Sequence, residues 1–580
     1  MATPIEIEVV GQPGSRRRFA RDIEWYLPRQ VGPLEVRITV PWMGPAWVHH
    51  PVLPRMLNRL WARVDQDWRS GDPSPLTAPF HFDASPGLQP FGMPRFLALR
   101  NEKGGFAFGW EGGTLVHSSV EWRQCETGIE LNLRFERPAD GSPWEPPCIR
   151  WVSAEPRELL TPRVFALAMG ELDSRFRRAP DQTVTWATWN DGVFRDIDAE
   201  RILDTSRFLA QTFENVGWIQ VDDGWAPEPA CVPSDDGSLG MSDLSAFYRP
   251  ERLVGDPRFP EGMRGLAGRI RDLGFRPMIW LTPAADARSE LVLDHPEWFQ
   301  ESCRLHFMPH LRFLDLSVPD ARAFLEHAFD LAFDTWTFEG TKLDFWSMGF
   351  EQTDATCRAA GRTPMEWMGW MLDAIRQRIP EDGRVVHCID LPFGGPVRAR
   401  WCDHFRFYAD SEGSCAVPSM VREQAAWTAL MTARYGVQRW WIPNADGLGT
   451  FPHIGMGPAD HRRWVALVTA SGTLTELAGW LDRAEPAAVE RVRTATRWAQ
   501  LGGSVVNPGF DPLATELLPP NVWVCEGQRG TVAGVTNWSD EPLTVDPPPG
   551  VGPLTNAFDG LPVEAEVTVP AGDGALLVPR

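Results

Sequence analysis

Aspartates stand at the ends of several apolar, strand-like segments of the sequence. These segments are WIQV, TKL, RVVHCI and FRFYA, and the acids are Asp222, Asp223, Asp344, Asp390 and Asp410. A single aspartate after a strand is explained by its preference for turns and helix starts. Parallel strands, however, bring their carboxyl ends to one mouth, where the catalytic residues of barrel enzymes lie. If these strands are parallel, the acids are candidates for a site of carboxyl chemistry.

A lysine close to one of these acids is unusual for this chain. Of 56 basic residues, only Lys103 and Lys342 are lysines, and the other 54 are arginines. Lys342 and Asp344 are two positions apart on one predicted strand, so both side chains point to the same face. If that face is the interior of a barrel, a compact ammonium group lies beside a carboxylate at the base of a pocket. An arginine would fit less well there, because its planar guanidinium is larger and directs its donors differently.

The elements that would carry these residues begin at about residue 180, where apolar strands alternate with amphipathic helices. This alternation is typical of parallel β/α construction. A helix is predicted after Pro319 and Asp320, because apolar residues then recur on one helical face as far as Phe333. We predict eight strands, at residues 184–189, 218–222, 276–281, 341–345, 384–389, 405–409, 438–442 and 473–477. Eight strands over about 300 residues match a (β/α)8 TIM barrel, and a doubly wound sheet is the alternative.

Both flanks of this region have the period-two pattern of β-strands. In residues 34–40 and 129–135, apolar positions alternate with polar ones, which is typical of strands with one buried face. Short strands between Gly/Pro turns indicate an antiparallel sandwich, interrupted by a predicted helix at about 51–69. Beyond about 505 the chain returns to β. We therefore predict an N-terminal β-sandwich domain at 1–175, a catalytic (β/α)8 barrel at 176–500 and a small C-terminal antiparallel β-sandwich at 501–580.

The composition excludes several classes of function. The net charge of −21 repels a phosphate backbone, so no nucleic-acid partner is expected. Neither a signal peptide nor an apolar stretch of membrane length is visible, so we expect a cytoplasmic protein without a membrane partner. The nine cysteines are scattered singly, which argues against disulfides and zinc knuckles. His306 and His310 are four apart but lack the glutamate of a zinc helix, and no phosphate loop is visible, so we expect neither a metal nor a cofactor.

A series of segments between about 180 and 480 resembles glycoside hydrolase family 36, the α-galactosidase and melibiase family of clan D. The segments occur in the family's order and are DQTVTWATWND, GWIQVDDGW, RFPEGMRGLAGRIRDLGFRPMIWL, HPEW, FLDLSVPDARAFL, TKLDF, HCIDLPFGG, DHFRFYAD and RWWIPNADGL. The related family 27 and the more distant family 31 share the barrel, but HPEW and FLDLS are more similar to family 36. The resemblance implies a retaining, exo-acting α-galactosidase that hydrolyses terminal α-D-galactosyl residues of oligosaccharides.

The resemblance also implies a catalytic pair. Asp344 matches the family's nucleophile at the end of the fourth strand, and Asp410 matches the general acid/base in an R-x-x-x-D pattern. Retaining hydrolysis needs two carboxyls about 5–5.5 Å apart, one ionised and one protonated. Lys342 would favour the ionised form of Asp344, whereas burial and a neighbouring anion would keep a proton on Asp410. Arg406, four residues before Asp410, matches a contact to the sugar 2-hydroxyl.

Further matches imply contacts to the sugar. Asp222 and Asp223 match a pair that binds the 4- and 6-hydroxyls, for which carboxylates are strong acceptors, and Lys342 matches a contact to the 3- and 4-hydroxyls. Cys388 matches a pocket cysteine that packs and does not attack. Tryptophans near strand ends can stack on a sugar ring, although each one alone is more often part of a core. They are Trp186, Trp189, Trp225, Trp280 and Trp441.

The sequence departs from the family where the sugar and the leaving group are concerned. Trp280-Leu281-Thr282-Pro283 stands where many members have W-x-E-P, and Asn444-Ala445-Asp446 stands at the start of the family's NDPDC. A transglycosidase of the raffinose-synthase kind therefore stays open, as does another sugar, such as an α-N-acetylgalactosaminide or a β-L-arabinopyranoside. A non-catalytic carbohydrate-binding protein is a further alternative, against which the presence of both Asp344 and Asp410 argues. Assembly into a homo-oligomer is also open.

Overall fold

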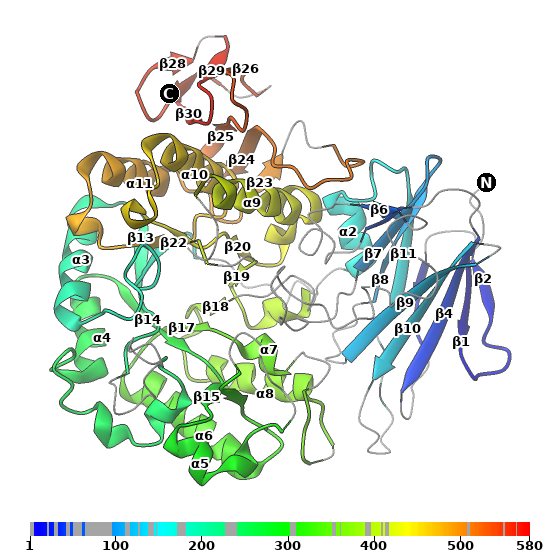
Figure 1. Ribbon diagram of the computed structural model, residues 1–580, viewed down its shortest axis with the longest axis horizontal. Helices are drawn as coiled ribbons and strands as arrows, with labels where there is room; N and C mark the ends of the chain where they lie inside the picture. Colours follow the sequence, from blue (N-terminus) through cyan, green and yellow to red (C-terminus); the bar gives the residue numbers. More distant parts are fainter. Residues whose placement is uncertain are drawn as a thin grey trace.

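The computed structural model contains antiparallel sheets at both ends of the chain and a long parallel sheet between them (Figure 1). The structure describes residues 5–19, 23–27, 33–41, 47–49, 61–63, 96–110, 117–125, 128–136, 144, 146, 148–170, 181–226, 241–301, 309–350, 355–359, 361–388, 396–407, 410–411, 417–506, 511–548, 552–563 and 565–580. Within these ranges, every helix is too short or too polar to cross a bilayer.

The N-terminal region consists of two antiparallel sheets. The first sheet contains β2 (Arg17–Phe19), β1 (Ile5–Val9), β4 (Leu34–Pro41), β10 (Gly128–Glu136) and β9 (His117–Cys125). The second contains β3 (Ile23–Trp25), β11 (Ile149–Ala154), β8 (Gly105–Gly109), β7 (Phe96–Arg100), β5 (Trp47–His49) and β6 (Ala62–Arg63). The predicted alternation is confirmed in β4, whose apolar side chains are buried and whose polar ones are half-exposed. Apolar side chains of both sheets form one core cluster, so the sheets pack face to face.

The predicted helix at about 51–69 is wrong where the structure describes it. Ala62–Arg63 (β6) pairs antiparallel with β5, and the Trp61 indole N–H donates to the Pro512 carbonyl at 2.7 Å. The remainder of that segment lies outside the described residues. Its apolar spacing fits a helix, but the backbone of residues 62–63 forms its hydrogen bonds at a sheet edge, and such tertiary pairing overrides local periodicity.

The predicted strands between 184 and 478 contribute to one sheet in which all neighbours run parallel. They are β12 (Val184–Ala187), β13 (Val216–Val221), β14 (Arg276–Leu281), β17 (Gly340–Leu343), β18 (Val385–His387), β19 (His404–Arg406), β20 (Ile442–Asn444), β21 (Gly447–Leu448) and β22 (Glu476–Ala478). The predictions at 438–442 and 473–477 begin too early. A 3₁₀ turn at Val437–Arg439 precedes β20, and a short apolar run does not distinguish such a buried turn from a strand.

The order of these strands differs from that of a doubly wound sheet. From β20 to β12 the neighbours follow the chain backwards, and β22 and β21 come next. The two edge strands, β20 and β21, are separated in the chain by only Ala445 and Asp446. The edges of the sheet are therefore adjacent, and the strands form a ring whose seventh strand is interrupted once. A doubly wound sheet would instead reverse its strand order at a switch point, whereas a ring of this order has the connectivity of a (β/α)8 barrel.

Helices alternate with the parallel strands and lie outside them (Figure 1). They are α3 (Ala199–Thr212), α4 (Gly262–Asp272), α5 (Glu290–Asp294), α6 (Pro319–Phe329), α7 (Trp346–Phe350), α8 (Pro364–Arg376), α9 (Val417–Ala429), α10 (Pro458–Ala470) and α11 (Pro486–Trp498), while α2 (Pro162–Met169) precedes the sheet. The predicted helix after Pro319 is α6, which continues as a π-helical segment at Asp330–Thr335. A short antiparallel pair, β15 (Ala284–Asp286) and β16 (Leu311–Phe313), follows β14.

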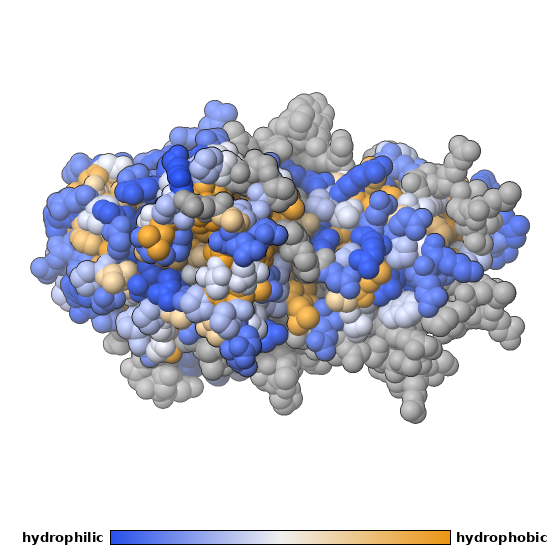
Figure 2. All heavy atoms as spheres, turned by 90° about the horizontal axis from the view of Figure 1, so that it is seen from above, coloured by the Kyte–Doolittle hydropathy of each residue, from blue (hydrophilic) through white to orange (hydrophobic). Residues whose placement is uncertain are grey.

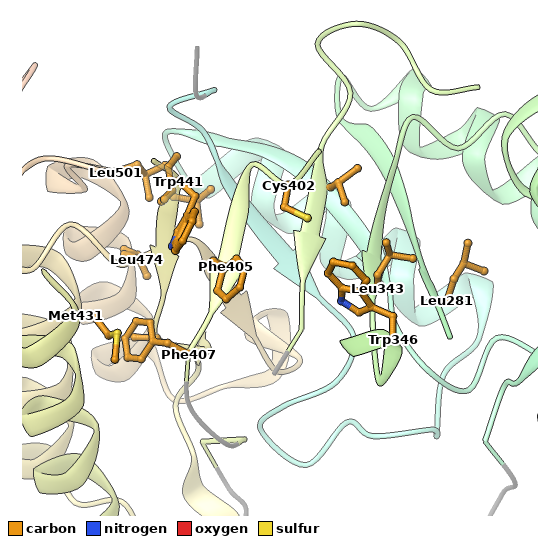
Figure 3. Close-up of a cluster of buried hydrophobic side chains, with 14 of the residues drawn as sticks. Leu281, Leu343, Trp346, Cys402, Phe405, Phe407, Met431, Trp441, Leu474 and Leu501 are labelled. Atoms are coloured by element: carbon orange, nitrogen blue, oxygen red, sulfur yellow. The ribbon is translucent and has the colours of Figure 1, made fainter. Parts of the chain in front are cut away.

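The core of this region lies between the strands and the helices. Figure 3 shows apolar side chains of the strands, including Leu343 and Phe405, in this buried cluster with Met431. Because side chains alternate along a strand, the neighbours Lys342 and Arg406 point to the other side, into the ring.

The C-terminal region packs against α10. Its larger sheet contains β23 (Ser504–Val506), β24 (Val522–Gly527), β25 (Gly530–Thr536), β30 (Gly574–Pro579), β27 (Leu554–Asn556) and β28 (Pro562–Val563), and the smaller one pairs β26 (Leu543–Val545) with β29 (Val567–Val569). A Cβ on Gly534 would lie 2.7 Å from the Ala466 carbonyl oxygen, so glycine permits the close approach of β25 to α10. On the face shown in Figure 2, small apolar areas lie among hydrophilic side chains.

Candidate active site

Lys342 and Asp222 form a buried ion pair inside the ring of strands. Lys342 Nζ on β17 lies 2.9 Å from Oδ2 of Asp222, which follows β13, and the two side chains are 2% and 1% exposed. The Gln220 amide donates to the same oxygen at 2.6 Å. Burial acts against a charged lysine, but the combined attraction of Asp222, Cys388 and Glu476 raises the pKa of Lys342 well above its ordinary value. The sequence predicted a carboxylate beside this lysine, and the direct partner is Asp222, not Asp344.

Asp223 has a cation of its own. Arg195 Nε donates to Asp223 Oδ2 at 2.8 Å, and the Ser242 backbone N–H donates to Oδ1 at 2.6 Å. Burial raises the pKa of Asp223, although Arg195 opposes this effect. Arg195 lies in the loop between β12 and α3, and the sequence reasoning did not identify it, because arginine is common throughout this chain.

Asp344 directly follows β17 and is buried. Its Oδ2 accepts a hydrogen bond from the Trp280 indole at 3.2 Å, and its Oδ1 accepts one from the Phe345 backbone at 2.8 Å. Phe345 has a φ of 57°, a left-handed conformation that bulky residues rarely adopt, so the turn after β17 is strained. Burial raises the pKa of Asp344, and the charges of Lys342 and Arg406 lower it only in part. The predicted direction of the Lys342 effect is thus confirmed, but burial outweighs it.

Asp410 contacts the guanidinium of Arg406, four residues earlier on β19. It also accepts a hydrogen bond from the Trp189 indole at 3.2 Å, and its side chain is 33% exposed. Burial acts to raise the pKa of Asp410, but Arg406 and Lys342 outweigh burial, and the pKa is lowered. The expectation of a protonated Asp410 is therefore wrong for the free site, because it left out the contact with Arg406.

Asp446 is a central residue of the site that the sequence reasoning missed. It interrupts the seventh strand, between β20 and β21, with a φ of 75°. Its Oδ1 accepts from Arg406 Nη1 at 3.1 Å and from the Asn190 amide at 2.9 Å, and its Oδ2 accepts from the Ser411 backbone at 2.6 Å. A Cβ on Gly447 would lie 2.9 Å from Asn190 Nδ2, so the glycine leaves room for this amide. An acid four residues beyond a predicted strand end was the available signal.

The five tryptophans near strand ends divide into two groups. Trp189 and Trp280 donate to the carboxylates of Asp410 and Asp344, as described above. The others belong to the core: the Trp225 indole donates to the Trp280 carbonyl and packs on Phe247 and Trp336, that of Trp186 donates to the Gly479 carbonyl, and that of Trp441 stacks on Phe405 (Figure 3). For these three, the explanation as core residues applies.

Three further residues named from the sequence are Cys388, Asp390 and His306. Cys388 follows β18 and is buried, and burial raises the pKa of its thiol well above the ordinary value. A thiol in this state is a poor nucleophile. Asp390 and His306 lie outside the described residues. Among the residues that the structure does describe, no three histidine, cysteine, aspartate or glutamate side chains are grouped in a way that could hold a metal ion.

Together, these contacts gather acidic and basic side chains at the carboxyl ends of parallel strands. Asp222, Asp344 and Asp410 follow β13, β17 and β19, and Asp446 follows β20. This position is where (β/α)8 enzymes carry their active sites. The arrangement supplies two carboxyls of different protonation tendency, Asp344 and Asp410, beside fixed cations, and so it is suited to acid–base and nucleophilic chemistry on a polar ligand.

Comparisons with known proteins find α-galactosidases among the proteins that this chain is similar to. No family model matches the chain. The α-galactosidase AgaA of Geobacillus stearothermophilus is 27% identical over 109 residues, which are 19% of this chain and 13% of the length of that relative. Among solved structures, the α-galactosidase TtGalA of Thermus thermophilus has a TM-score of 0.55 at 18% identity and covers 87% of this chain and 96% of its own.

The solved structure of AgaA, a family 36 α-galactosidase, has a TM-score of 0.57 at 12% identity, with 100% of this chain and 89% of its own covered. At these identities the likeness concerns the fold. The chain thus shares the fold of family 36 α-galactosidases, and the resemblance that the sequence indicated is confirmed at this level.

Proposed function

We propose that the chain is a retaining, exo-acting α-galactosidase with Asp344 and Asp410 as its catalytic pair. The observation that supports this most is the position of the two carboxyls. Both lie at the carboxyl end of the ring, each accepts a hydrogen bond from an indole, and the charge of Asp410 acts on Asp344. A carboxyl pair with separate roles is what retaining glycosidases use, and the α-galactosidases of the same fold favour this choice of sugar.

In the proposed reaction, ionised Asp344 attacks the anomeric carbon of a terminal α-galactosyl residue. Asp410 gives its proton to the glycosidic oxygen, and the leaving sugar departs as an alcohol. The galactosyl residue is then esterified to Asp344. Asp410, now ionised, takes a proton from water while the water oxygen attacks the anomeric carbon, which releases galactose and restores both carboxyls.

Proton uptake by Asp410 is coupled to substrate binding in this proposal. In the free site the Arg406 contact lowers the pKa of Asp410. When a sugar 2-hydroxyl accepts a hydrogen bond from Arg406, the guanidinium changes partner and its contact with Asp410 is lost. The carboxyl then protonates more readily, because burial alone favours its neutral form.

The remaining polar residues would bind the sugar. Asp222 and Asp223 would accept hydrogen bonds from the 4- and 6-hydroxyls, Lys342 would donate to the 3- and 4-hydroxyls, and Trp189 and Trp280 offer aromatic surface beside the two catalytic carboxyls. Cys388 would pack against this sugar.

We also propose that the three predicted units, 1–175, 176–500 and 501–580, are the domains of the protein.

A panel of nitrophenyl glycosides tests the proposal. We expect hydrolysis of the α-galactoside, almost none by Asp344→Asn, and rescue of Asp344→Gly by azide with formation of a β-galactosyl azide. Asp334→Asn, an exposed aspartate on the helical segment after α6, is the matched control. A fully active Asp344→Asn variant would contradict the assignment. Product analysis with and without sucrose as acceptor distinguishes hydrolysis from transfer of the raffinose-synthase kind.

A further inference from the structure

Glu476 is a buried carboxyl inside the ring of strands that the proposed reaction does not use. It lies on β22, in register with Thr185 on β12 and Gly447 on β21. Arg384, which directly precedes β18, donates a hydrogen bond to the Thr185 hydroxyl at 2.7 Å. Since β12 and β18 are not neighbours in the sheet, this bond crosses the interior of the ring, and the side chains in register with Thr185 face that interior. Glu476 is 2% exposed, and its Oε1 receives no hydrogen bond from any residue that the structure describes.

Lys342 faces Glu476 across the ring. Counted along the sheet, β17 and β22 are four strands apart, which in a ring of eight means opposite sides. The charges that act on Glu476 come from Lys342 on β17, Asp222 after β13, Arg406 on β19 and Asp446 between β20 and β21. These are the same residues that form the candidate active site.

The charges in this interior do not balance if every acid is ionised. Arg384 also reaches this interior but is paired with Asp181 at 3.1 Å. The other two cations among the described residues of the interior, Lys342 and Arg406, stand among five carboxyl groups, those of Asp222, Asp344, Asp410, Asp446 and Glu476. Lys342 binds Asp222, and Arg406 binds Asp410 and Asp446. An ionised Glu476 would have no cation of its own, and a buried anion without one is strongly unfavourable. It would instead compete with Asp222 for Lys342.

We propose that Glu476 is a positioning residue whose neutral form leaves Lys342 bound to Asp222. The lysine then stays at the level of the strand ends, where it can donate to a ligand. On ionisation, Glu476 attracts the ammonium toward itself, away from the mouth. Glu476 thus sets the position of Lys342 without touching the ligand.

The protonation behaviour of Glu476 agrees with this geometry. Burial raises the pKa of Glu476, Lys342 opposes this effect, and the nearby Asp446 and Asp222 raise the pKa further, to about 7. Below that pH Glu476 is neutral, and above it the competition for Lys342 begins.

The presence of only two lysines makes a direct test practicable. In protein labelled with carbon-13 at the lysine ε-position, only Lys103 and Lys342 give signals. Lys103 is exposed on the turn between β7 and β8, and Lys103→Arg assigns the two resonances. We expect the Lys342 signal of the wild type to shift with a midpoint at about pH 7 and the Lys103 signal to stay constant there.

Glu476→Gln should abolish this shift, because a neutral amide of the same shape cannot ionise. Glu476→Met, which also lacks a charge, should do the same and provides a second variant in case the first does not fold. If the Lys342 titration is the same in the wild type and in either variant, the proposal is overturned. This readout requires no enzymatic activity, so it decides the question even if the chain does not hydrolyse galactosides.

A second readout rests on the proposed α-galactosidase activity. If only the form with neutral Glu476 binds substrate well, about one-tenth of the wild type is competent one pH unit above the midpoint, so KM should rise about tenfold there. In Glu476→Gln, KM should not rise over this pH range. The pH dependence of kcat that arises from Asp410 should persist in this variant. An equal rise of KM in both proteins would overturn the proposal.

Discussion

Replacing Lys342 with methionine should strongly destabilise the folded protein. Methionine retains much of the length of the side chain but removes the cation that lies 2.9 Å from Asp222, in a pair whose side chains are 2% and 1% exposed. Removing one partner of a buried ion pair leaves an uncompensated charge and costs about 3–5 kcal/mol. Because the Gln220 amide still donates to Asp222, we expect the lower end, about 3 kcal/mol.

Denaturant-induced unfolding of four proteins measures this effect: the wild type, Lys342→Met, Asp222→Asn and the double variant. The double variant should be less destabilised than Lys342→Met, because no charge is left without a partner.

The matched control is Lys103→Met, which removes the only other lysine of the chain from an exposed turn. It should change the free energy of unfolding by less than about 0.5 kcal/mol. A Lys342→Met variant that is as stable as Lys103→Met would refute the argument from burial.

Lys342→Arg keeps the charge but places a larger planar group in the site, so kcat/KM should fall at least about tenfold, or about 1.4 kcal/mol, while Lys103→Arg remains at the wild-type value. If Asp222 and Asp223 bind the 4- and 6-hydroxyls, steady-state kinetics should show at least about tenfold preference for α-galactosides over α-glucosides, and the opposite preference would contradict this assignment. Burial raises the pKa of Asp243 to about 6 from an ordinary 3.8, so between these values the folded chain holds a proton that the unfolded chain lacks, and stability falls as pH rises. Asp243→Asn should therefore gain about 3 kcal/mol relative to the wild type across this range, as followed by thermal unfolding, and a constant difference would show that Asp243 does not titrate there.

The sequence predicted the fold correctly wherever the spacing of apolar residues matches the side chains that are buried. The alternation in residues 34–40 and the apolar runs around Ile219 and Ile279 predicted strands correctly, because these side chains are buried on the faces that the pattern indicates. The helix at about 51–69 failed at Ala62–Arg63, where a sheet edge takes up the backbone hydrogen bonds. Local spacing carries no information about a distant strand.

For the candidate site, the sequence identified residues but not their partners. Asp222, Lys342, Asp344 and Asp410 do gather at the strand ends, but the pairing of Lys342 with Asp222 depends on how the strands are arranged in the ring. The contact of Arg406 with Asp410, which reverses the expected protonation of the free acid, also follows only from three dimensions.

Asp446 and Glu476 were missed for a related reason. The predicted seventh strand ended at residue 442, although β20 extends to Asn444, so Asp446 was not expected at a strand end. Glu476 fell within a predicted strand, where an acid does not reveal whether it faces the interior or the solvent.

Because the seventh strand is interrupted at Asp446, the ring of strands and the contacts of Arg406 in the candidate site are completed in the same step. Among the strands that the structure describes, β20 pairs with β19 alone and β21 with β22 alone, so the ring closes when both halves have docked. One of the two residues between them, Asp446, binds Arg406 at a different guanidinium nitrogen from Asp410. A chain in which β20 and β21 have not yet both paired therefore has its strands formed, but the guanidinium of Arg406 is not yet held in place. During refolding, ligand binding should accordingly return later than secondary structure. Its return should mark the step at which β20 and β21 have both paired.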